Sequence, residues 1–118
     1  MMIKLLKSKL HKATITDANL DYDGSITIAR DLLDLVGIHV HESVHVFNIN
    51  NGNRFETYTI EGPAQSGVVC VNGAAARLVS PGDSIIIVAF TWLSEKEAQL
   101  FRPKVCLLDL DNRPKTSH

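Results

Sequence analysis

The sequence predicts a mainly β protein, a small closed barrel of short strands with two brief helices. Seven runs of four to seven residues are rich in β-branched and other apolar side chains, and turn residues bound most of them. Closing such a sheet removes exposed strand edges. Of the 118 residues, 45% are hydrophobic, which is enough to form the core of one domain.

The predicted strands follow one another with turn signals between them. Asn50-Asn51-Gly52-Asn53 predicts a hairpin turn, because Asn and Gly tolerate a positive φ. Asn72-Gly73 and Pro81-Gly82-Asp83 separate later strands in the same way. The strands are expected at residues 13–16, 25–28, 43–49, 54–60, 67–71, 84–90 and 105–110.

Two helices are predicted outside the strands. Ser94 is a candidate N-cap for a helix within residues 95–101. The polar tail, residues 111–118, is expected to be frayed. The other helix covers residues 30–36 and ends at Gly37, with four apolar side chains on one stripe: Leu32, Leu33, Leu35 and Val36.

Composition and charge exclude several classes of function. The net charge is −1, with 12 basic and 13 acidic residues, so neither nucleic acid nor an anionic membrane is an expected partner. No apolar run approaches the ~18–20 residues of a transmembrane helix. Lys4, Lys7 and Lys9 are not followed by the apolar stretch of a secretory signal, so a cytoplasmic protein is expected. Cys70 and Cys106 lie in apolar runs, which favours buried, reduced thiols over a disulfide.

The stretch Tyr22-Asp23-Gly24-Ser25-Ile26-Thr27-Ile28 allows two interpretations. One is a plain turn that enters a strand. In the other, Ser25 Oγ attacks the carbonyl carbon of Gly24, which has no side chain and can hold an unusual backbone conformation. Elimination from the resulting ester releases the Gly24 carboxylate, and hydrolysis leaves a pyruvoyl ketone at position 25. Such a ketone forms a Schiff base with an amine and serves as a covalent cofactor.

Four blocks of the sequence give the second interpretation its weight: residues 7–16, 18–28, 50–58 and 71–90. In order and spacing they resemble the pyruvoyl-dependent aspartate 1-decarboxylases, which make β-alanine for pantothenate (coenzyme A) biosynthesis. The resemblance implies a six-stranded double-psi β-barrel with short helices. It also implies a single domain, 1–118, that cuts itself between Gly24 and Ser25 into 1–24 and 25–118. The family forms homotetramers with sites between subunits, and some relatives need an accessory maturation protein.

The resemblance also assigns roles to individual residues. Ser25 matches the residue that becomes the pyruvoyl group, and Tyr58 matches the proton donor. Phe47 stands where many relatives have Trp, which implies a slightly altered pocket wall. The residues implied in self-processing are Gly24, Ser25, Thr57, Tyr22 and His11. The residues implied in substrate binding are Lys9, Arg54, Thr57, Asn72, Gly73, Ala74 and Ala75.

The chemistry explains why these residue types are suitable. When the α-carboxylate of L-aspartate leaves as CO2, its carbon needs a proton, and a tyrosine phenol is protonated at neutral pH. The retained β-carboxylate needs a cation, which Arg54 can supply as a bidentate fork and Lys9 as a point charge. A cation on the leaving carboxylate would instead stabilise the ground state.

The spacing of Arg54 and Tyr58 constrains how one site could use both. They are four residues apart on one predicted strand and therefore share a face. At the rise of a strand they stand ~13 Å apart, which is long for one aspartate. Either the strand bends, or the two roles are filled from different subunits, and a tetramer fits the second option.

Each of these features also has an ordinary structural interpretation. Tyr58 could be a packing residue, and Arg54 a solvated charge. The segment 72–76 could be a tight turn into small-residue packing, or could offer backbone N–H groups to an anion. A non-catalytic binding or assembly module on the same barrel is the alternative function. The residues whose joint presence favours the enzyme are Gly24, Ser25, Arg54, Thr57 and Tyr58.

His39, His41 and His45 form an H-x-H-x-x-x-H pattern. On one uninterrupted strand the three would share a face and could bind a metal ion. A break expected near Glu42 interrupts that geometry, and no acidic residue lines up as a further ligand. No metal site is predicted.

Overall fold

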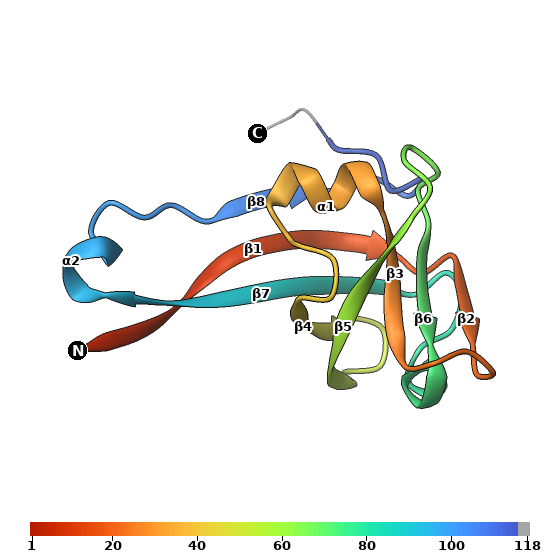
Figure 1. The fold of residues 1–118 in the computed structure, drawn as a ribbon. Coiled ribbons are helices and arrows are strands. Elements are labelled where there is room, and N and C mark those ends of the chain that lie inside the picture. The colour runs from red at the N-terminus through yellow and green to blue at the C-terminus, as the bar shows by residue number, and fades with distance from the viewer. Residues whose placement is uncertain (116–118) are drawn as a thin grey trace.

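Eight strands form one continuous hydrogen-bonded ladder in the computed structural model, which describes residues 1–115 (Figure 1). This confirms the prediction of a mainly β protein with short helices. The elements are β1 (Met2–Thr14), β2 (Asp17–Asn19), β3 (Ser25–Ala29), α1 (Arg30–Val36), β4 (Ser43–Asn48), β5 (Arg54–Gly62), β6 (Val69–Asn72), the 3-10 helix η1 (Gly73–Leu78), β7 (Ser84–Ser94), α2 (Glu95–Ala98) and β8 (Lys104–Leu107).

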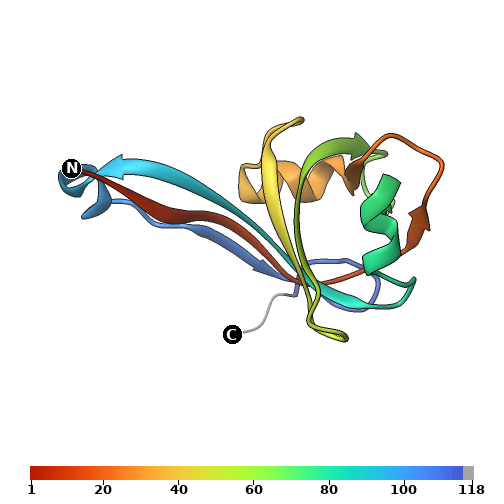
Figure 2. The same ribbon diagram turned by 90° about the horizontal axis from the view of Figure 1, so that it is seen from below.

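The ladder closes into a barrel because the chain of β1 continues into β2. The strand order is β2-β6-β3-β5-β4-β7-β1-β8, so six strands lie between the edge strands β2 and β8. After Thr14, Thr16 donates its backbone N–H to the carbonyl of Val69 at 2.8 Å, and β2 then pairs in parallel with β6. Figure 2 shows the resulting ring of strands from below.

Alternating side chains of the barrel strands form the core. On β3, Ile26 and Ile28 are fully buried, and they stand opposite the buried Val71 and Val69 of β6. The side chains between them, including Thr27, lie on the outer face of the sheet. This alternation therefore decides which polar residues of β3 and β6 meet on the outer face.

Helix α1 covers the barrel with Leu32, Leu33 and Val36, which are buried. The prediction that Leu35 belongs to the same stripe is wrong, since Leu35 is 48% exposed. At 100° per residue it falls about 60° outside the arc of the other three. Gly37 ends the helix with φ +71°, as predicted.

An arm projects from the barrel (Figures 1 and 2). It consists of the N-terminal half of β1, the C-terminal half of β7, β8 and α2. The predicted strands 13–16 and 84–90 were too short here, because β1 begins at Met2 and pairs with β7 as far as Ser94. Register shifts interrupt the pairing after Leu6 and after His11. Such irregularities break the alternation of period two by which a strand is recognised in sequence.

Ser94 caps α2 as predicted, although the helix ends at Ala98 rather than reaching residue 101. Its hydroxyl accepts from the backbone N–H of Glu97 at 3.1 Å, and the Glu97 carboxylate accepts from the Ser94 N–H at 2.9 Å. Within residues 1–115, no helix has both the length and the apolar character needed to cross a membrane.

The prediction of a frayed tail is wrong for residues 111–115, while residues 116–118 lie outside the described residues. Asn112 is 1% exposed and has a positive φ of 58°. Its Oδ1 accepts from the Thr14 N–H at 2.7 Å, and its Nδ2 donates to the carbonyls of Thr14 and Gly67 at 2.8 Å. One asparagine thus fastens the C-terminal segment to the end of β1.

Replacing Asn112 by Ala is expected to lower the free energy of unfolding by about 2–3 kcal/mol, because buried backbone groups lose partners and Ala is strained at a positive φ. Urea unfolding at fixed protein concentration measures this. Asp111→Ala is the matched control: Asp111 is exposed, and its change should stay within about 0.5 kcal/mol. Equal midpoints for the two variants would contradict the fastening role.

Candidate active site

Ser25 is the first residue of β3, and its hydroxyl both donates and accepts a hydrogen bond. Ser25 is 2% exposed. Its Oγ donates to the backbone carbonyl of Asp23 at 3.2 Å and accepts from Nδ2 of Asn72 at 3.0 Å. The hydroxyl that is predicted to attack the Gly24 carbonyl is therefore buried, oriented and next to that peptide bond.

Asn72 reaches Ser25 because β3 and β6 are antiparallel with these two residues directly opposite. Its Nδ2 also donates to Oγ1 of Thr27 at 3.0 Å, so both amide hydrogens are used. Its Oδ1 accepts from the thiol of Cys70 at 3.3 Å. The amide thus joins side chains of two strands on the outer face of the barrel.

The backbone of Gly73 packs directly against Gly24. A Cβ at Gly73 would lie 2.6 Å from the Gly24 Cα and 2.8 Å from its nitrogen. Gly73 also has φ +77°, in the left-handed region. Only glycine satisfies both conditions, and their consequence is that the turn at Gly24 lies against the start of η1.

Gly24 itself does not use the backbone freedom of a positive φ. Its φ is not positive, and a Cβ built there would meet nothing within 4 Å. The strict requirement for glycine lies at its neighbour in space, Gly73.

The segment 72–76, for which a tight turn was one interpretation, contains the N-cap and the first residues of the 3-10 helix η1. Asn72 stands at its N-cap position without a side-chain capping bond, which leaves the amide free for Ser25. Ala74 is exposed, whereas Ala75 packs partly against the core. The small side chains let η1 lie close to the barrel.

Tyr58 belongs to the same outer face as Ser25. Ile26 of β3 pairs in parallel with Thr59 of β5, so the same register continued by one residue sets Tyr58 beside Ser25. Tyr58 is 41% exposed, and its ring meets His41 edge to face at 6.2 Å between centroids. The predicted proton donor and the predicted pyruvoyl position are therefore neighbours.

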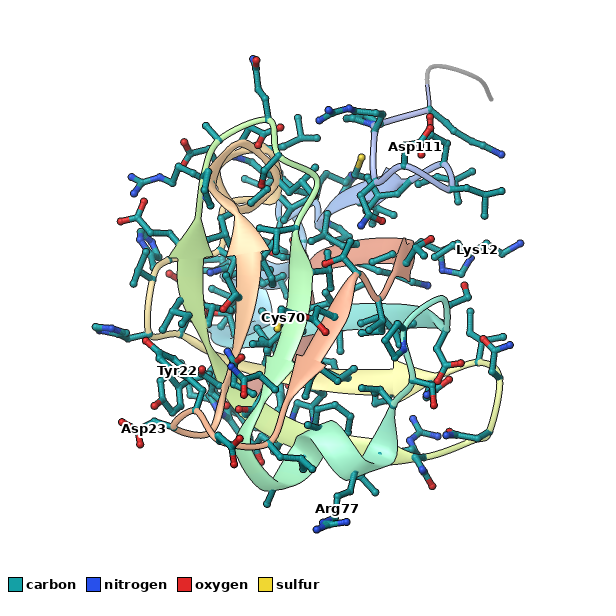
Figure 3. All side chains as sticks on the ribbon, turned by 90° about the vertical axis from the view of Figure 1, so that its right-hand side faces the viewer. Lys12, Tyr22, Asp23, Cys70, Arg77 and Asp111 are labelled. Carbon is teal, nitrogen blue, oxygen red and sulfur yellow. The ribbon has the colours of Figure 1, made fainter. Side chains whose placement is uncertain are left out.

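Thr57 and Tyr22, which are also implied in self-processing, do not lie on the outer face beside Ser25. Thr57 alternates with Tyr58 and pairs with the buried Val44, on the opposite face of β5. Tyr22 is 53% exposed in the loop before β3, and its backbone carbonyl borders Gly73. Figure 3 shows Tyr22 and Asp23 together in this loop, at one end of the barrel, with Cys70 on β6.

The predicted substrate-binding cations lie on the same outer face but away from Ser25. Lys9 and His11 share one face of β1, as predicted. His11 stands in a row with Ile86, Phe47 and Arg54 across four neighbouring strands. Three strand spacings of ~4.8 Å separate His11 from Arg54 by about 14 Å. Lys9 is on β1, four places from β3 in the strand order, and Arg54 is four residues along β5 from Tyr58, so one chain does not gather these two cations around Ser25.

Arg54 and Phe47 form a contact that the sequence did not indicate. The guanidinium carbon lies 4.1 Å from the centroid of the Phe47 ring, within the range of a cation–π interaction. The aromatic ring thus fixes the position of the charge.

The surroundings of His11 disfavour a positive charge on its imidazole. Burial lowers the pKa of its imidazole, and the nearby charges of Lys9 and Lys12 lower it further. Among the buried side-chain atoms of residues 1–115, Nδ1 of His11 is the one without a hydrogen-bond partner. A neutral ring with an unsatisfied nitrogen is the result.

The three histidines considered as metal ligands do not form a cluster. His41 has φ +71° in the turn before β4, and His45 lies on β4 with its ring edge to face with Phe90 at 5.5 Å. In the part of the chain that is described, no three His, Cys, Asp or Glu side chains are grouped for a metal ion. Cys70 and Cys106 are free thiols, half-buried rather than buried.

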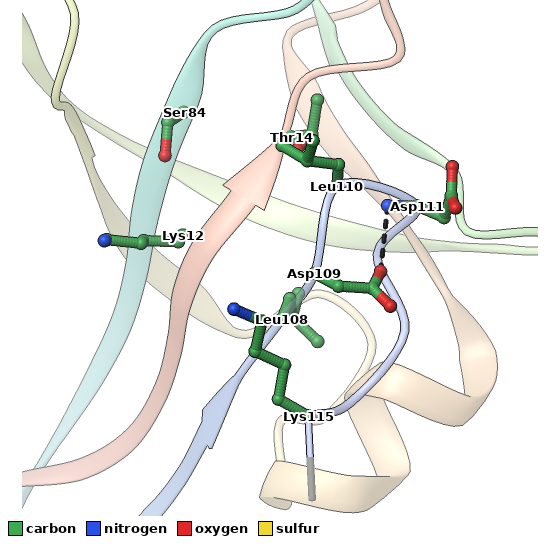
Figure 4. A pocket seen from close by; sticks show the side chains of 8 residues that line it. All are labelled: Lys12, Thr14, Ser84, Leu108, Asp109, Leu110, Asp111 and Lys115. Atoms are coloured by element: carbon green, nitrogen blue, oxygen red, sulfur yellow. Dashed lines mark hydrogen bonds between the residues drawn. The ribbon is translucent and has the colours of Figure 1, made fainter. Parts of the chain in front are cut away.

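A pocket of about 510 Å³ lies between the end of β1 and the C-terminal segment (Figure 4). Lys12, Lys115 and Asp109 line it together with Asp111, whose backbone N–H donates to the Asp109 carboxylate at 2.9 Å. None of the predicted site residues line this pocket.

Two polar residues around Ser25 were missed by the sequence analysis. Thr27 and Cys70 both contact the Asn72 amide. Their strand alternation was readable, since Thr27 lies two residues after Ser25 and Cys70 two residues before Asn72. The pairing of β3 with β6 was not.

The arrangement of the strands places the protein in the class of double-psi β-barrels. Its fold is similar to the crystal structure of a rationally designed double-psi β-barrel protein, with a TM-score of 0.50 and 15% identity over 65% of this chain and 90% of that one. The six strands between β2 and β8 agree with the predicted double-psi β-barrel.

The chain belongs to the aspartate decarboxylase family, whose model matches residues 1–115. It is 55% identical to the aspartate 1-decarboxylase of Acetivibrio thermocellus, over 96% of this chain and 90% of that protein. It is 56% identical to that of Bacillus pumilus, over 92% and 85%. For Neisseria meningitidis the identity is 54%, over 96% and 89%.

The pKa of His11 is expected to lie below 6.5, because burial and two lysines disfavour its charged form. An NMR pH titration of its imidazole measures the midpoint. Lys9→Gln removes one of the charges and should raise the midpoint toward 6.5. A midpoint above 6.5 in the unaltered protein, or one that Lys9→Gln lowers, would contradict this electrostatic account.

Proposed function

We propose that this chain is a pyruvoyl-dependent aspartate 1-decarboxylase that converts L-aspartate to β-alanine and CO2 for pantothenate biosynthesis. One observation carries the proposal: in a chain of this family, the buried Ser25 hydroxyl is held by Asn72 beside the Gly24–Ser25 bond. The similarity to proteins named aspartate 1-decarboxylase favours this enzyme over the alternative, a non-catalytic binding module.

Self-processing would begin at the held hydroxyl. Oγ bonds to the Gly24 carbonyl carbon as the peptide C–N bond breaks, and the hydroxyl proton passes to the freed nitrogen. The ester then loses the Ser25 Cα proton and the Gly24 carboxylate, and water replaces the nitrogen to leave the ketone, releasing ammonia. The products are chains 1–24 and 25–118.

The residues around Ser25 suit the pyruvoyl group that this reaction would create. Asn72 and Thr27 supply polar atoms at hydrogen-bond distance from one another on the outer face. When present, the ketone supplies a carbonyl that condenses with the substrate amine and takes up the electrons left by CO2. Tyr58 lies on the same face and can return a proton to the α-carbon.

Substrate recognition is assigned to the cations of the outer face. Arg54, stacked on Phe47, can grip the β-carboxylate in a bidentate fork, and Lys9 adds a second positive charge. A neutral His11 can donate or accept one hydrogen bond without adding charge. The other residues assigned to the wall of the substrate site are Asn72, Gly73, Ala74 and Ala75.

A homotetramer with sites between subunits fits the separation of Ser25 from the cations Arg54 and Lys9. Phe90 and Trp92 of β7 share the outer face with Lys4 and Leu6, and Trp92 is 60% exposed. A second subunit on this face would cover apolar surface and could bring its cations to the first subunit's Ser25. An accessory maturation protein is a possible further partner.

Ser25→Ala is expected to remain a single chain and to release no β-alanine, since it lacks the attacking hydroxyl. Intact-mass measurement should show two pieces for the unaltered protein, after long incubation with and without cell lysate. Hydroxylamine should react with the ketone of the larger piece. Ser66→Ala, in a surface loop, is the control and should cleave normally. An unaltered protein that stays whole and unreactive would overturn the proposed function.

Arg54→Gln is expected to raise the KM for aspartate about 10- to 100-fold, because a charge-assisted bidentate contact is lost. The same assay on Arg113→Gln, an exposed arginine of the C-terminal segment, should give an unchanged KM. Unchanged affinity in Arg54→Gln would remove Arg54 from the substrate site.

Sites shared between subunits predict complementation. Chains carrying Ser25→Ala and chains carrying Arg54→Ala should each be inactive or weakly active alone. Coexpressed in equal amounts, they should recover about one quarter of the normal sites, because a random neighbouring pair has both intact residues with that frequency. Separately assembled proteins, mixed without subunit exchange, are the control. No recovery on coexpression would argue for a site within one chain.

A further inference from the structure

We infer that Cys70 is a positioning residue for maturation: its thiol orients the Asn72 amide so that Nδ2 faces the Ser25 hydroxyl. The inference rests on the proposed self-processing at Gly24–Ser25. It adds a residue that touches neither the cleaved bond nor the substrate.

The argument starts from what the amide must offer. Ser25 already donates its hydroxyl proton to the Asp23 carbonyl at 3.2 Å, so its oxygen can only accept from Asn72. That requires Nδ2, and not Oδ1, on the side of Ser25. If the amide were turned around, the hydroxyl would have to give its proton to Asn72 and leave Asp23.

Thr27 does not decide between the two orientations. Its hydroxyl accepts from Nδ2 at 3.0 Å here, but a hydroxyl can equally donate to an amide oxygen. No side-chain cap fixes Asn72 at the start of η1 either. A group at the other end of the amide that donates more readily than it accepts would favour one orientation.

The Cys70 thiol is such a group. It lies on β6 two residues before Asn72, on the same face, and its Sγ is 3.3 Å from Oδ1. Burial raises the pKa of this thiol, with a smaller contribution from the charge of Asp17, so it stays protonated at neutral pH. A protonated thiol is a weak donor and a poor acceptor, which favours Oδ1 as its partner.

The chain supplies a matched control for this role. Cys106 is the other free thiol, and like Cys70 it is half-buried with a pKa raised by burial. Its Sγ lies 3.6 Å from the backbone carbonyl of Leu107 on β8, and it has no contact with Asn72. Replacing either thiol removes similar volume, and only Cys70 acts on the amide.

The test follows cleavage of newly made precursor. After brief expression, synthesis is stopped and the fraction cut into 1–24 and 25–118 is measured by intact mass over time. Cys70→Ala should slow cleavage about five- to tenfold, the loss of roughly one hydrogen bond in the attacking geometry. Cys70→Ser keeps a donor but brings a hydroxyl that can also accept, so it should cleave faster than Cys70→Ala and more slowly than the unaltered protein. Cys106→Ala should cleave normally.

The outcomes separate this inference from the proposed function. Cleavage of Cys70→Ala at the normal rate would overturn the inference, and so would a Cys70→Ser variant as slow as Cys70→Ala. Thermal midpoints are measured alongside, and a slow Cys70→Ala with a midpoint equal to that of Cys106→Ala supports positioning over general destabilisation. Failure of the unaltered protein to cleave would instead refute self-processing itself.

Discussion

The approach of Gly73 to Gly24 is the constraint on which the candidate site depends. With 2.6 Å between a hypothetical Gly73 Cβ and the Gly24 Cα, the two backbones touch without any side chain between them. This contact brings the end of β6 against the Gly24–Ser25 turn and sets Asn72 opposite Ser25. Barrel closure fixes both partners, since Thr16 and β2 hold the other edge of β6. Tertiary packing therefore orients the Gly24–Ser25 turn, and Gly24 itself needs no positive φ.

A small barrel has little interior to offer a polar substrate, and this one is filled with aliphatic side chains. Lys9, Ser25, Arg54, Tyr58 and Asn72 accordingly lie on the outer face of the sheet, where alternation puts every second residue of β1, β3, β5 and β6, whereas Thr57 lies on the inner face of β5. Such a surface is open unless something covers it. The proposed assembly of several copies would turn an exposed face into an enclosed site, which also strengthens electrostatic contacts by excluding water.

Local patterns predicted much of the fold, whereas the centre of the candidate site was predicted from the resemblance of four sequence blocks to a known family. The Gly24-Ser25 turn, helix α1 and the Ser94 cap could be predicted because neighbours in sequence determine them. The full length of β1 could not, because bulges after Leu6 and His11 break its alternation and β7 supplies its hydrogen bonds. The same holds for Asn112, whose role depends on carbonyls 45 and 98 residues away. Likewise, the sequence contained Cys70 but not the strand pairing that gives it a function.

The outer face has two parts, one around Ser25 and one around the cations and His11. They differ in how many of their polar groups find hydrogen-bond partners within one chain. Around Ser25 each polar group of the network has a partner: both Asn72 hydrogens, its oxygen, and the serine hydroxyl. A fully connected network of this kind holds one geometry, which suits an intramolecular attack. On the cation side, the Nδ1 of His11 is buried without a partner. If the proposed function holds, self-cleavage would draw on groups complete within a chain, whereas substrate binding would need what a neighbouring subunit adds.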